Sequence, residues 1–351
     1  MTERLPPGAR GPTGAGGTTR SGRAFGLGAL LVVAAPALTG CGPERTMLSP
    51  VSTDAGRAAD LWWLMFWIGA VIWTLVTAAT LYALYRRGRG QQDPLARRRW
   101  ENTPLIWGGI VLPSIVLVLV TGVTVDAMRR TDHRAGPGTM VVQVIGHQWW
   151  WEVRYPERDV VTANEVRVPA GRPVRIELTT ADVIHSFWVP ALAGKVDLIP
   201  GRTNTLWINT DRPGVYEGQC AEFCGLQHAR MRFRVVVAPE PTFRQWLAGQ
   251  EQPATEPADE LAVRGREVFL SASCVHCHSI RGTAEVGASG PDLTHLASRD
   301  TLAAGIMPNT KGHLGGWIVD PQQVKPGARM PGSDLSPDDL QALLAYLGSL
   351  E

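Results

Sequence analysis

The sequence predicts a multidomain protein with three parts: a two-helix transmembrane hairpin, an all-β domain and an all-α domain. Three observations predict this fold class. Two long apolar segments lie in the first third of the chain, short alternating segments follow them, and a separate helical region ends the chain. The expected boundaries are a signal peptide at 1–41, the hairpin at 42–127, the β domain at 128–240, a linker at 241–260 and the α domain at 261–351.

Length and charge limit the possible functions. At 351 residues the chain is long enough for two domains and additional segments. Its net charge of +2 gives no reason to expect a nucleic-acid partner. The five cysteines can all be given separate uses, described below, so no pair is left for a structural disulfide.

The N-terminal segment has the order of an export signal. A basic tract, Arg4–Arg23, precedes the apolar run Ala24–Leu38 and the residues Leu38-Thr39-Gly40-Cys41. These last four residues resemble the lipobox of bacterial lipoproteins, which would make Cys41 the lipidated first residue. An uncleaved signal anchor is the alternative, but the apolar core is shorter than the roughly 20 residues that a spanning helix needs.

Two membrane spans are expected at about 61–85 and 105–125. Aromatic residues lie near both ends of the first span, as is typical of membrane interfaces. The loop between the spans is rich in arginine, which predicts a cytoplasmic loop and places both chain ends outside. Its arginines are Arg86, Arg87, Arg89, Arg97, Arg98 and Arg99.

Short segments of alternating polarity follow the second span, separated by Gly and Pro. The segments are Met140–Ile145, Glu165–Val168, Val174–Leu178, Thr203–Asn209 and Arg232–Val237. Strands at this spacing predict a small β-sandwich or barrel whose end loops are free to hold functional residues.

The segment from Cys220 to Met231 has the spacing of a copper loop. Cys224, His228 and Met231 supply the thiolate, imidazole and weak thioether of a single-copper site, and Cys220 adds a second thiolate. Two thiolates can bridge two ions, which then need a second imidazole, and His185 is placed to supply it.

Two alternatives exist, one for the pair of cysteines and one for the second imidazole. Cys220 and Cys224 could form a disulfide, but a disulfide explains neither His228 nor Met231. His147 is the rival to His185 as a ligand, although it lies inside an aromatic run.

This loop resembles the dinuclear CuA centre of cytochrome c oxidase subunit II, and the β domain would then be a cupredoxin. The resemblance implies bridging thiolates from Cys220 and Cys224, imidazoles from His185 and His228, a weak thioether from Met231 and the backbone carbonyl of Glu222. It also implies that the Glu222 side chain helps to hold a magnesium ion at the subunit I interface.

A run of aromatic residues, Gly146 to Trp151, supports the same resemblance. By position Trp149 matches the tryptophan at which an electron from cytochrome c enters. Trp150 stands where the family commonly has Tyr, and both Trp150 and Trp151 are expected to fill the core or an interface.

The C-terminal domain contains a c-type haem attachment motif, Cys274-Val275-His276-Cys277-His278. Two thiols add to the haem vinyl groups and the adjacent histidine binds iron, so Cys274, Cys277 and His278 are assigned to one covalent haem. Helices are expected at Leu261–Ser273 and Ser336–Leu350, with Gly265 allowing close approach. This arrangement resembles a class I cytochrome c.

Two Met-Pro pairs compete for the sixth position on iron. Met330 precedes the closing helix, as in cytochromes c with an axial Met, and is favoured. Met307 is expected to be a packing residue.

The two metal motifs occur in the order of a subunit II with a fused cytochrome c, as in caa-type haem-copper oxidases. The resemblance implies a proton-pumping aerobic oxidase in the bacterial plasma membrane, with the chain multi-pass and its copper and haem domains extracytoplasmic. Its expected partners are subunit I, subunit III and a donor such as a cytochrome bc complex or a soluble cytochrome c. One departure is Pro104, where many relatives have a Glu associated with proton uptake; Glu101 is the nearest substitute.

Three other classes of protein share some of these features. A quinol oxidase subunit II lacks the copper ligands, and nitrous oxide reductase has a large preceding domain for which this chain has no room. A membrane-anchored haem and copper electron carrier that is not part of an oxidase remained the alternative function.

Overall fold

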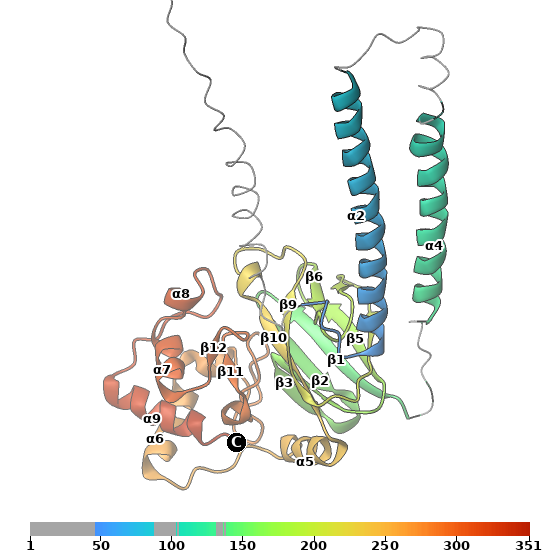
Figure 1. Ribbon diagram of the computed structural model, residues 1–351. Coiled ribbons are helices and arrows are strands. Elements are labelled where there is room, and N and C mark those ends of the chain that lie inside the picture. The colour runs from blue at the N-terminus through green and yellow to red at the C-terminus, as the bar shows by residue number, and fades with distance from the viewer. Residues whose placement is uncertain (1–45, 88–102, 104, 131–135, 137) are drawn as a thin grey trace, which may run out of the picture. The chain divides into compact units, whose positions relative to one another are not determined.

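Two long apolar helices begin the described part of the chain (Figure 1). The structure, a computed structural model, describes residues 46–87, 103, 105–130, 136 and 138–351. The helices are α2 (Thr53–Arg87) and α4 (Leu112–Arg130), and the π-helical turn η3 (Trp107–Val111) precedes α4. The predicted signal peptide with Cys41, most of the arginine loop, Glu101 and Pro104 lie outside the described residues.

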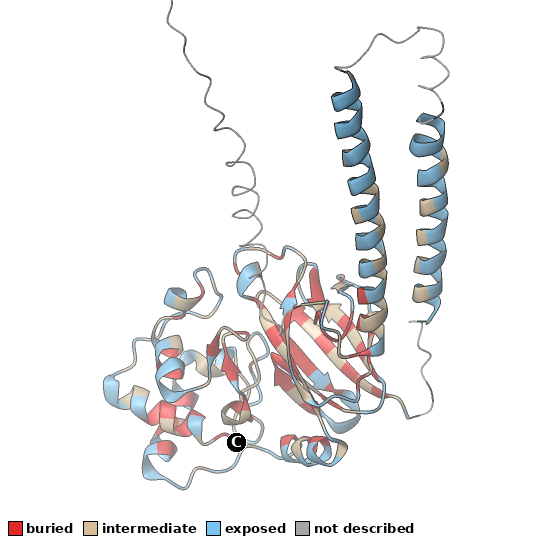
Figure 2. Ribbon diagram, in the orientation of Figure 1, coloured by how far each residue is buried: buried red, intermediate tan, exposed pale blue. Residues whose placement is uncertain are grey.

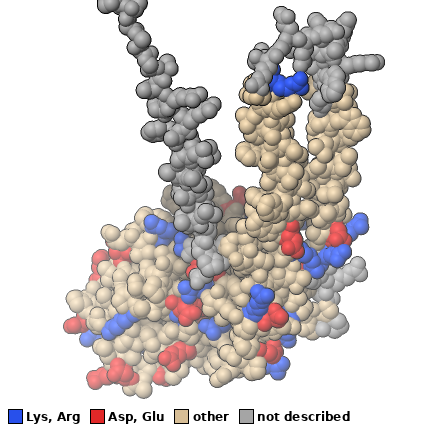
Figure 3. Space-filling view, in the orientation of Figure 1, with Lys and Arg blue, Asp and Glu red and all other residues tan. Residues whose placement is uncertain are grey.

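Both helices are long and apolar enough to cross a membrane. Thr53–Arg86 has 34 residues with a mean hydropathy of 1.9 in its best window, and Trp107–Arg130 has 24 residues with 2.3. Figure 3 shows Lys, Arg, Asp and Glu near the ends of these helices, whereas the middle part of each helix carries no charged side chain on this face. These helices include almost all of the predicted spans 61–85 and 105–125.

The second span changes its helix type immediately before a proline. The backbone N–H of Leu112 donates to the carbonyl oxygen of Trp107, which is the five-residue spacing of a π-helix. Pro113 follows and has no N–H to donate, so the wider turn accommodates its ring within the span.

The β domain consists of two five-stranded sheets. The first has the order β3-β2-β1-β5-β8, from β1 (Met140–His147), β2 (Trp150–Tyr155), β3 (Val160–Ala163), β5 (Val174–Thr180) and β8 (Asn204–Ile208). The second has the order β4-β10-β9-β6-β7, from β4 (Glu165–Pro169), β6 (His185–Trp188), β7 (Val196–Leu198), β9 (Gly214–Cys220) and β10 (Arg232–Ala238). The small β-sandwich predicted from the alternating segments is confirmed.

The core of this domain lies between the sheets, where alternate residues of each strand are buried (Figure 2). The pattern is regular in β1, β5 and β10, where every second side chain is buried. Large rings fill the centre, and Trp151 contacts both Phe187 and Phe233 edge-on at ring-centroid distances of 5.7 and 5.0 Å. A rigid sandwich of this kind fixes the loops at its ends.

Helix α5 (Glu240–Gln250) follows the last strand and belongs to the β domain by its packing. Phe243 and Leu247 are buried in the same core as the strands. The first half of the predicted linker 241–260 is therefore this helix, and helix α6 begins at Glu260.

The C-terminal domain is helical, as predicted. Its helices are α6 (Glu260–Ser271), α7 (Lys311–Val319), α8 (Pro321–Val324) and α9 (Pro337–Gly348), with the short turns η6 (Ser273–His276) and η7 (Leu296–Ser298). A two-stranded ladder joins β11 (Thr301–Leu302) to β12 (Met307–Pro308). Asp259 and Ser336 cap α6 and α9 by accepting hydrogen bonds from backbone N–H groups.

Helices α6 and α9 meet at Gly265. A Cβ atom built on this glycine would lie 1.9 Å from the carbonyl oxygen of Ala342 in α9. Backbone atoms cannot move aside as a flexible side chain can, so only glycine allows the two helices to approach this closely. The close approach expected at Gly265 is confirmed.

We expect Gly265→Ala to lower the free energy of unfolding of the helical domain by about 1–3 kcal/mol, because α6 must move away from α9. Denaturant unfolding followed by helical circular dichroism measures this change. Gly316→Ala in α7 is the matched control, since a Cβ there would meet nothing within 4 Å. Equal stability of the two variants would contradict the proposed close contact.

Candidate metal centres

The copper loop connects two neighbouring strands of the second sheet. Cys220 is the last residue of β9, and its N–H donates to the carbonyl oxygen of Met231 at 2.9 Å, which closes the base of the loop. The 3-10 turn η5 (His228–Arg230) lies within it. His185 begins β6, and Phe187 in that strand pairs with Cys220. The sheet therefore brings residues that are 35 positions apart to one site.

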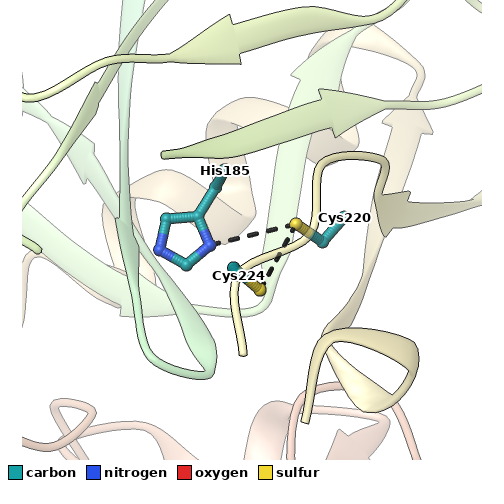
Figure 4. A group of neighbouring side chains, drawn as sticks. All are labelled: His185, Cys220 and Cys224. Atoms are coloured by element: carbon teal, nitrogen blue, oxygen red, sulfur yellow. Dashed lines mark hydrogen bonds between the residues drawn. The ribbon is translucent and has the colours of Figure 1, made fainter. Parts of the chain in front are cut away.

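The sulfur and nitrogen atoms of this loop and of His185 in β6 form one cluster, of which Figure 4 shows His185, Cys220 and Cys224. Sγ of Cys220 lies 3.9 Å from Nδ1 of His185 and 3.8 Å from Sγ of Cys224. Sγ of Cys224 lies 3.7 Å from Nδ1 of His228 and 3.8 Å from Sδ of Met231. The structure thus brings together all five side chains that the sequence assigned to copper.

These spacings fit shared metal ions and do not fit a disulfide. Two ligand atoms that are each about 2.3 Å from one tetrahedral ion lie about 3.7 Å apart. A disulfide needs sulfurs about 2.05 Å apart, far closer than the 3.8 Å between Cys220 and Cys224. Thiolate, imidazole and thioether donors together favour copper among the common metals.

The cluster is shielded from water. His185 and Met231 are fully buried, and Cys220 and Cys224 are buried as well. Ligands that are buried and held by a rigid sheet keep their positions when the charge of a bound ion changes. One-electron transfer is favoured by such a small structural rearrangement. His228, on the loop side, is partly exposed.

His185 is oriented by a carboxylate. Its Nε2 lies 2.9 Å from Oδ1 of Asp182. A carboxylate accepts hydrogen bonds, so Nε2 carries the proton and the lone pair of Nδ1 points to Cys220. Sequence reasoning did not assign a role to Asp182. Its position three residues before a ligand histidine was the available signal.

The two cysteines are linked by a hydrogen bond between their sulfurs. The hydrogen bond between the two sulfurs lowers the pKa of Cys220. The pKa of Cys224 is raised, because its proton is held in that bond. Cys220 is therefore the first of the two thiols to lose its proton, and binding of a cation would release the other.

The backbone and side chain of Glu222 have different surroundings. Its carbonyl oxygen lies 3.2 Å from Sγ of Cys220, so the backbone directs this oxygen toward the cluster. Its side chain is partly exposed. The magnesium role of that carboxylate stays a prediction.

The aromatic run forms the turn between β1 and β2, where His147 pairs with Trp150 and leaves Gln148 and Trp149 at the tip. Nε1 of Trp149 donates to the carbonyl oxygen of Cys224 at 2.9 Å, and Nε2 of Gln148 donates to the same oxygen at 2.8 Å. The Trp149 ring is thus fixed directly against a copper-loop residue, as the prediction for this tryptophan requires.

The other residues of the run are not at the cluster. Nε2 of His147 contacts the Glu152 carboxylate at 2.9 Å, and its ring stacks on Trp150. Trp151 is fully buried in the core. These contacts agree with the choice of His185 over His147 and with structural roles for Trp150 and Trp151.

The haem motif surrounds the turn η6. Cys274 is partly buried, Cys277 is exposed, and both are free thiols. Nδ1 of His278 lies 2.7 Å from the carbonyl oxygen of Pro291. A carbonyl only accepts, so Nδ1 is protonated and Nε2 keeps the lone pair that a haem iron needs. Burial lowers the pKa of His278, which favours this neutral form.

Further observations fit a haem in this domain. A Cβ on Gly287 would lie 2.5 Å from Cys277, and one on Gly290 would lie 2.7 Å from His278, so the chain packs tightly around the motif. Nε of Arg299 is buried and has no hydrogen-bond partner among the described residues, which leaves a donor for an acidic group of a ligand.

The two candidate methionines differ in their surroundings. Met307 is 9% exposed, lies in β12 and is part of the domain core. Met330 is partly buried beside that core, in the segment between α8 and α9. This contrast agrees with Met307 as a packing residue, and the assignment of Met330 to iron stays a prediction.

The other histidines of the helical domain have structural contacts. His295 is buried, and its two ring nitrogens lie 2.5 Å from the carbonyl oxygen of Glu351 and 3.0 Å from that of Gln252. His313 contacts the hydroxyl of Thr310 at the start of α7. His276 is exposed.

Comparison with known families agrees with both sites. Residues 157–238 match the family described as cytochrome c oxidase subunit II, periplasmic domain, and residues 262–351 match the cytochrome c family. The chain is therefore of the class that joins a copper-binding cupredoxin-like domain and a haem-binding cytochrome c domain to two candidate membrane helices.

Whole-chain relatives identify the family. Cytochrome c oxidase subunit 2 of Alkalihalophilus pseudofirmus is 38% identical over 324 residues, which are 90% of this chain and 94% of the relative. The protein of the same name from Bacillus sp. PS3 is 32% identical over 93% of this chain and 96% of the relative. This chain belongs to the cytochrome c oxidase subunit 2 family and is a component of a haem-copper oxidase.

One solved structure is also similar. The periplasmic domain of subunit II of cytochrome oxidase from Bradyrhizobium japonicum is 30% identical and covers 34% of this chain and 97% of its own, with a TM-score of 0.32.

Proposed function

We propose that this chain carries electrons from an external donor through its own c-type haem to a dinuclear copper centre and on to subunit I, where oxygen is reduced. Cys274, Cys277, His278 and Met330 hold the haem. Cys220, Cys224, His185, His228, Met231 and the carbonyl of Glu222 hold the copper ions. Trp149 is the point where electrons reach the copper site. In subunit I each O₂ takes four electrons and four protons to give two waters.

The observation that carries this proposal is the buried cluster of two sulfurs and one imidazole. The indole N–H of Trp149 donates a hydrogen bond to the backbone carbonyl oxygen of Cys224, a member of this cluster. His185, Cys220 and Cys224 offer ligand atoms that all lie within 4.8 Å of one another. A site so shielded and already held together by the fold suits electron transfer better than substrate chemistry, which needs an open position on the metal.

The wider assignment includes proton pumping by the complete oxidase, a magnesium ion at the subunit I interface and association with subunit III. The donor is a cytochrome bc complex or a soluble cytochrome c. The protein lies in the plasma membrane with both metal domains outside. The composition of the helices and the family of the chain support this location.

Purification of the full chain from cells supplied with copper and haem tests the proposal. Metal analysis should give two coppers per covalent haem, and a haem-copper subunit I with many helices should co-purify. Isolation of a fully loaded chain without such a partner would favour the free-standing electron carrier.

We expect a reporter that is active only outside the membrane to work when it is fused after Glu351 and to fail when it is fused near Gln91. The arginine-rich loop around Gln91 should be retained on the cytoplasmic side. Activity measurements on the two fusions check this, and expression of both is controlled by immunoblotting. The reverse pattern would contradict the two-span topology.

A further inference from the structure

One buried lysine joins the haem-domain segment before Met330 to the turn that carries Trp149. The side chain of Lys325 is only 3% exposed. Its Nζ donates to the carbonyl oxygen of Trp149 at 2.9 Å and to that of Ala303 at 3.3 Å. An amine donates hydrogen bonds whether or not it carries a third proton, so both contacts persist in either form.

Lysine is rare in this sequence. Of 34 basic residues only Lys195, Lys311 and Lys325 are lysines, and the rest are arginines. Burial lowers the pKa of Lys325 to about 7. A lysine can occupy such a site because it can become neutral, whereas an arginine would stay charged.

The residues around Lys325 make further contacts with the copper loop. The carbonyl oxygen of Val324 accepts from Arg230, and that of Pro326 accepts from the buried Gln227. A Cβ on Gly327 would lie 2.9 Å from Leu226. Because this segment, 324–329, contacts the loop at several points, it is an extended docking surface.

A further contact also lies at the Trp149 turn. The guanidinium of Arg329 donates to Oε1 of Gln148 at 2.6 Å and lies 3.9 Å from the Asp182 carboxylate. Asp182 in turn orients His185. The docking segment therefore reaches the side chains that position the copper ligands, and it leads directly into Met330.

Trp149 links the two sides of this contact. Its carbonyl oxygen accepts from Lys325, and its indole N–H donates to the carbonyl oxygen of Cys224. A single residue is thus hydrogen-bonded to the haem domain through its backbone and to the copper loop through its ring.

We infer that Lys325 is a positioning residue that fixes the haem domain of this chain against Trp149, so that its own haem delivers electrons to the copper site. The inference rests on the proposed function. In this step one electron leaves the haem iron, which is oxidised, and enters the copper pair, which is reduced, and no bond or proton changes. Lys325 acts through the geometry of Trp149 and does not touch either centre.

The test is the rate of electron transfer from haem to copper within the purified oxidase, measured optically after rapid photoreduction of the haem. We expect Lys325→Met, which keeps the length and removes both hydrogen bonds, to lower this rate by roughly tenfold or more, since displacements of about 1 Å can have large effects on rate. Lys311→Met is the matched control, because Lys311 is an exposed lysine in the same domain. It should keep the wild-type rate.

A second readout separates positioning from a general structural defect. In Lys325→Met the remaining contacts include the exposed Arg329, so the rate should become sensitive to salt, whereas the wild-type rate should not. Haem content, copper content and direct reduction of copper by a small reductant should stay unchanged.

The outcomes are distinct. A wild-type rate in Lys325→Met overturns the inference. If that variant does not assemble, Arg329→Gln decides, since its side chain is exposed: a several-fold decrease supports docking through this segment, and an unchanged rate overturns it. No transfer in the loaded wild-type oxidase would overturn the proposed electron path itself.

Discussion

Cys220→Ser is expected to reduce the copper content of the β domain from two ions to about one. The substitution leaves His185, Cys224, His228 and Met231, whose sulfur and nitrogen atoms are the donors of a single-copper site. Without the second bridging thiolate the unpaired electron can no longer be shared between two ions. Electron paramagnetic resonance should therefore change from coupling with two copper nuclei to coupling with one.

Oxidase activity of this variant should fall by at least about 100-fold, since even the loss of residues behind metal ligands commonly costs 10–100-fold. Ser186→Ala is the matched control, because Ser186 is buried next to the site and its hydroxyl has no hydrogen-bond partner among the described residues. It should retain both coppers. Two coppers with a shared electron in Cys220→Ser would show that Cys220 is not a bridge.

Met330→Ala should change the reduction potential of the haem, whereas Met307→Ala should change the stability of the domain. Met330→Ala is expected to lower the reduction potential of the haem and change its optical spectrum, because a Met ligand raises the potential. The haem itself should stay attached through Cys274 and Cys277. Met307→Ala should keep the potential and lower the free energy of unfolding by about 2–5 kcal/mol, since it removes a buried side chain.

Optical redox titration and denaturant unfolding of both variants, in the full chain, distinguish the two roles. Each methionine serves as the control for the other. If the potential falls in Met307→Ala and not in Met330→Ala, the assignment of the sixth ligand is wrong.

Strands with a regular alternation were predicted from the sequence, as were the short strands Glu165–Pro169 and Asn204–Ile208, but other strands without it were missed. Met140–His147, Val174–Thr180 and Arg232–Ala238 alternate along their length and were found with ends within two residues. Gly214–Cys220 was missed, because its buried positions do not alternate. It is a strand because it pairs with Arg232–Ala238, and the sequence shows no sign of that pairing.

The clustering of the five candidate copper ligands was predictable because four of these side chains lie within one loop at fixed spacing. Asp182 and Lys325 were not assigned roles. Each acts through a contact that the fold creates, and Lys325 is separated from Trp149 by 176 positions in the chain. No local pattern marks a lysine whose partner is a distant backbone carbonyl.

The pairing of Phe187 with Cys220 also has a consequence for biogenesis. The unfolded chain already holds Cys220, Cys224, His228 and Met231 on one short peptide, so it can bind a metal before folding. His185 joins them only when β6 has paired with β9. A site with all five side chains in place therefore has to follow sheet formation, and in the folded domain Cys220, Cys224 and Met231 are buried whereas His228 stays partly exposed.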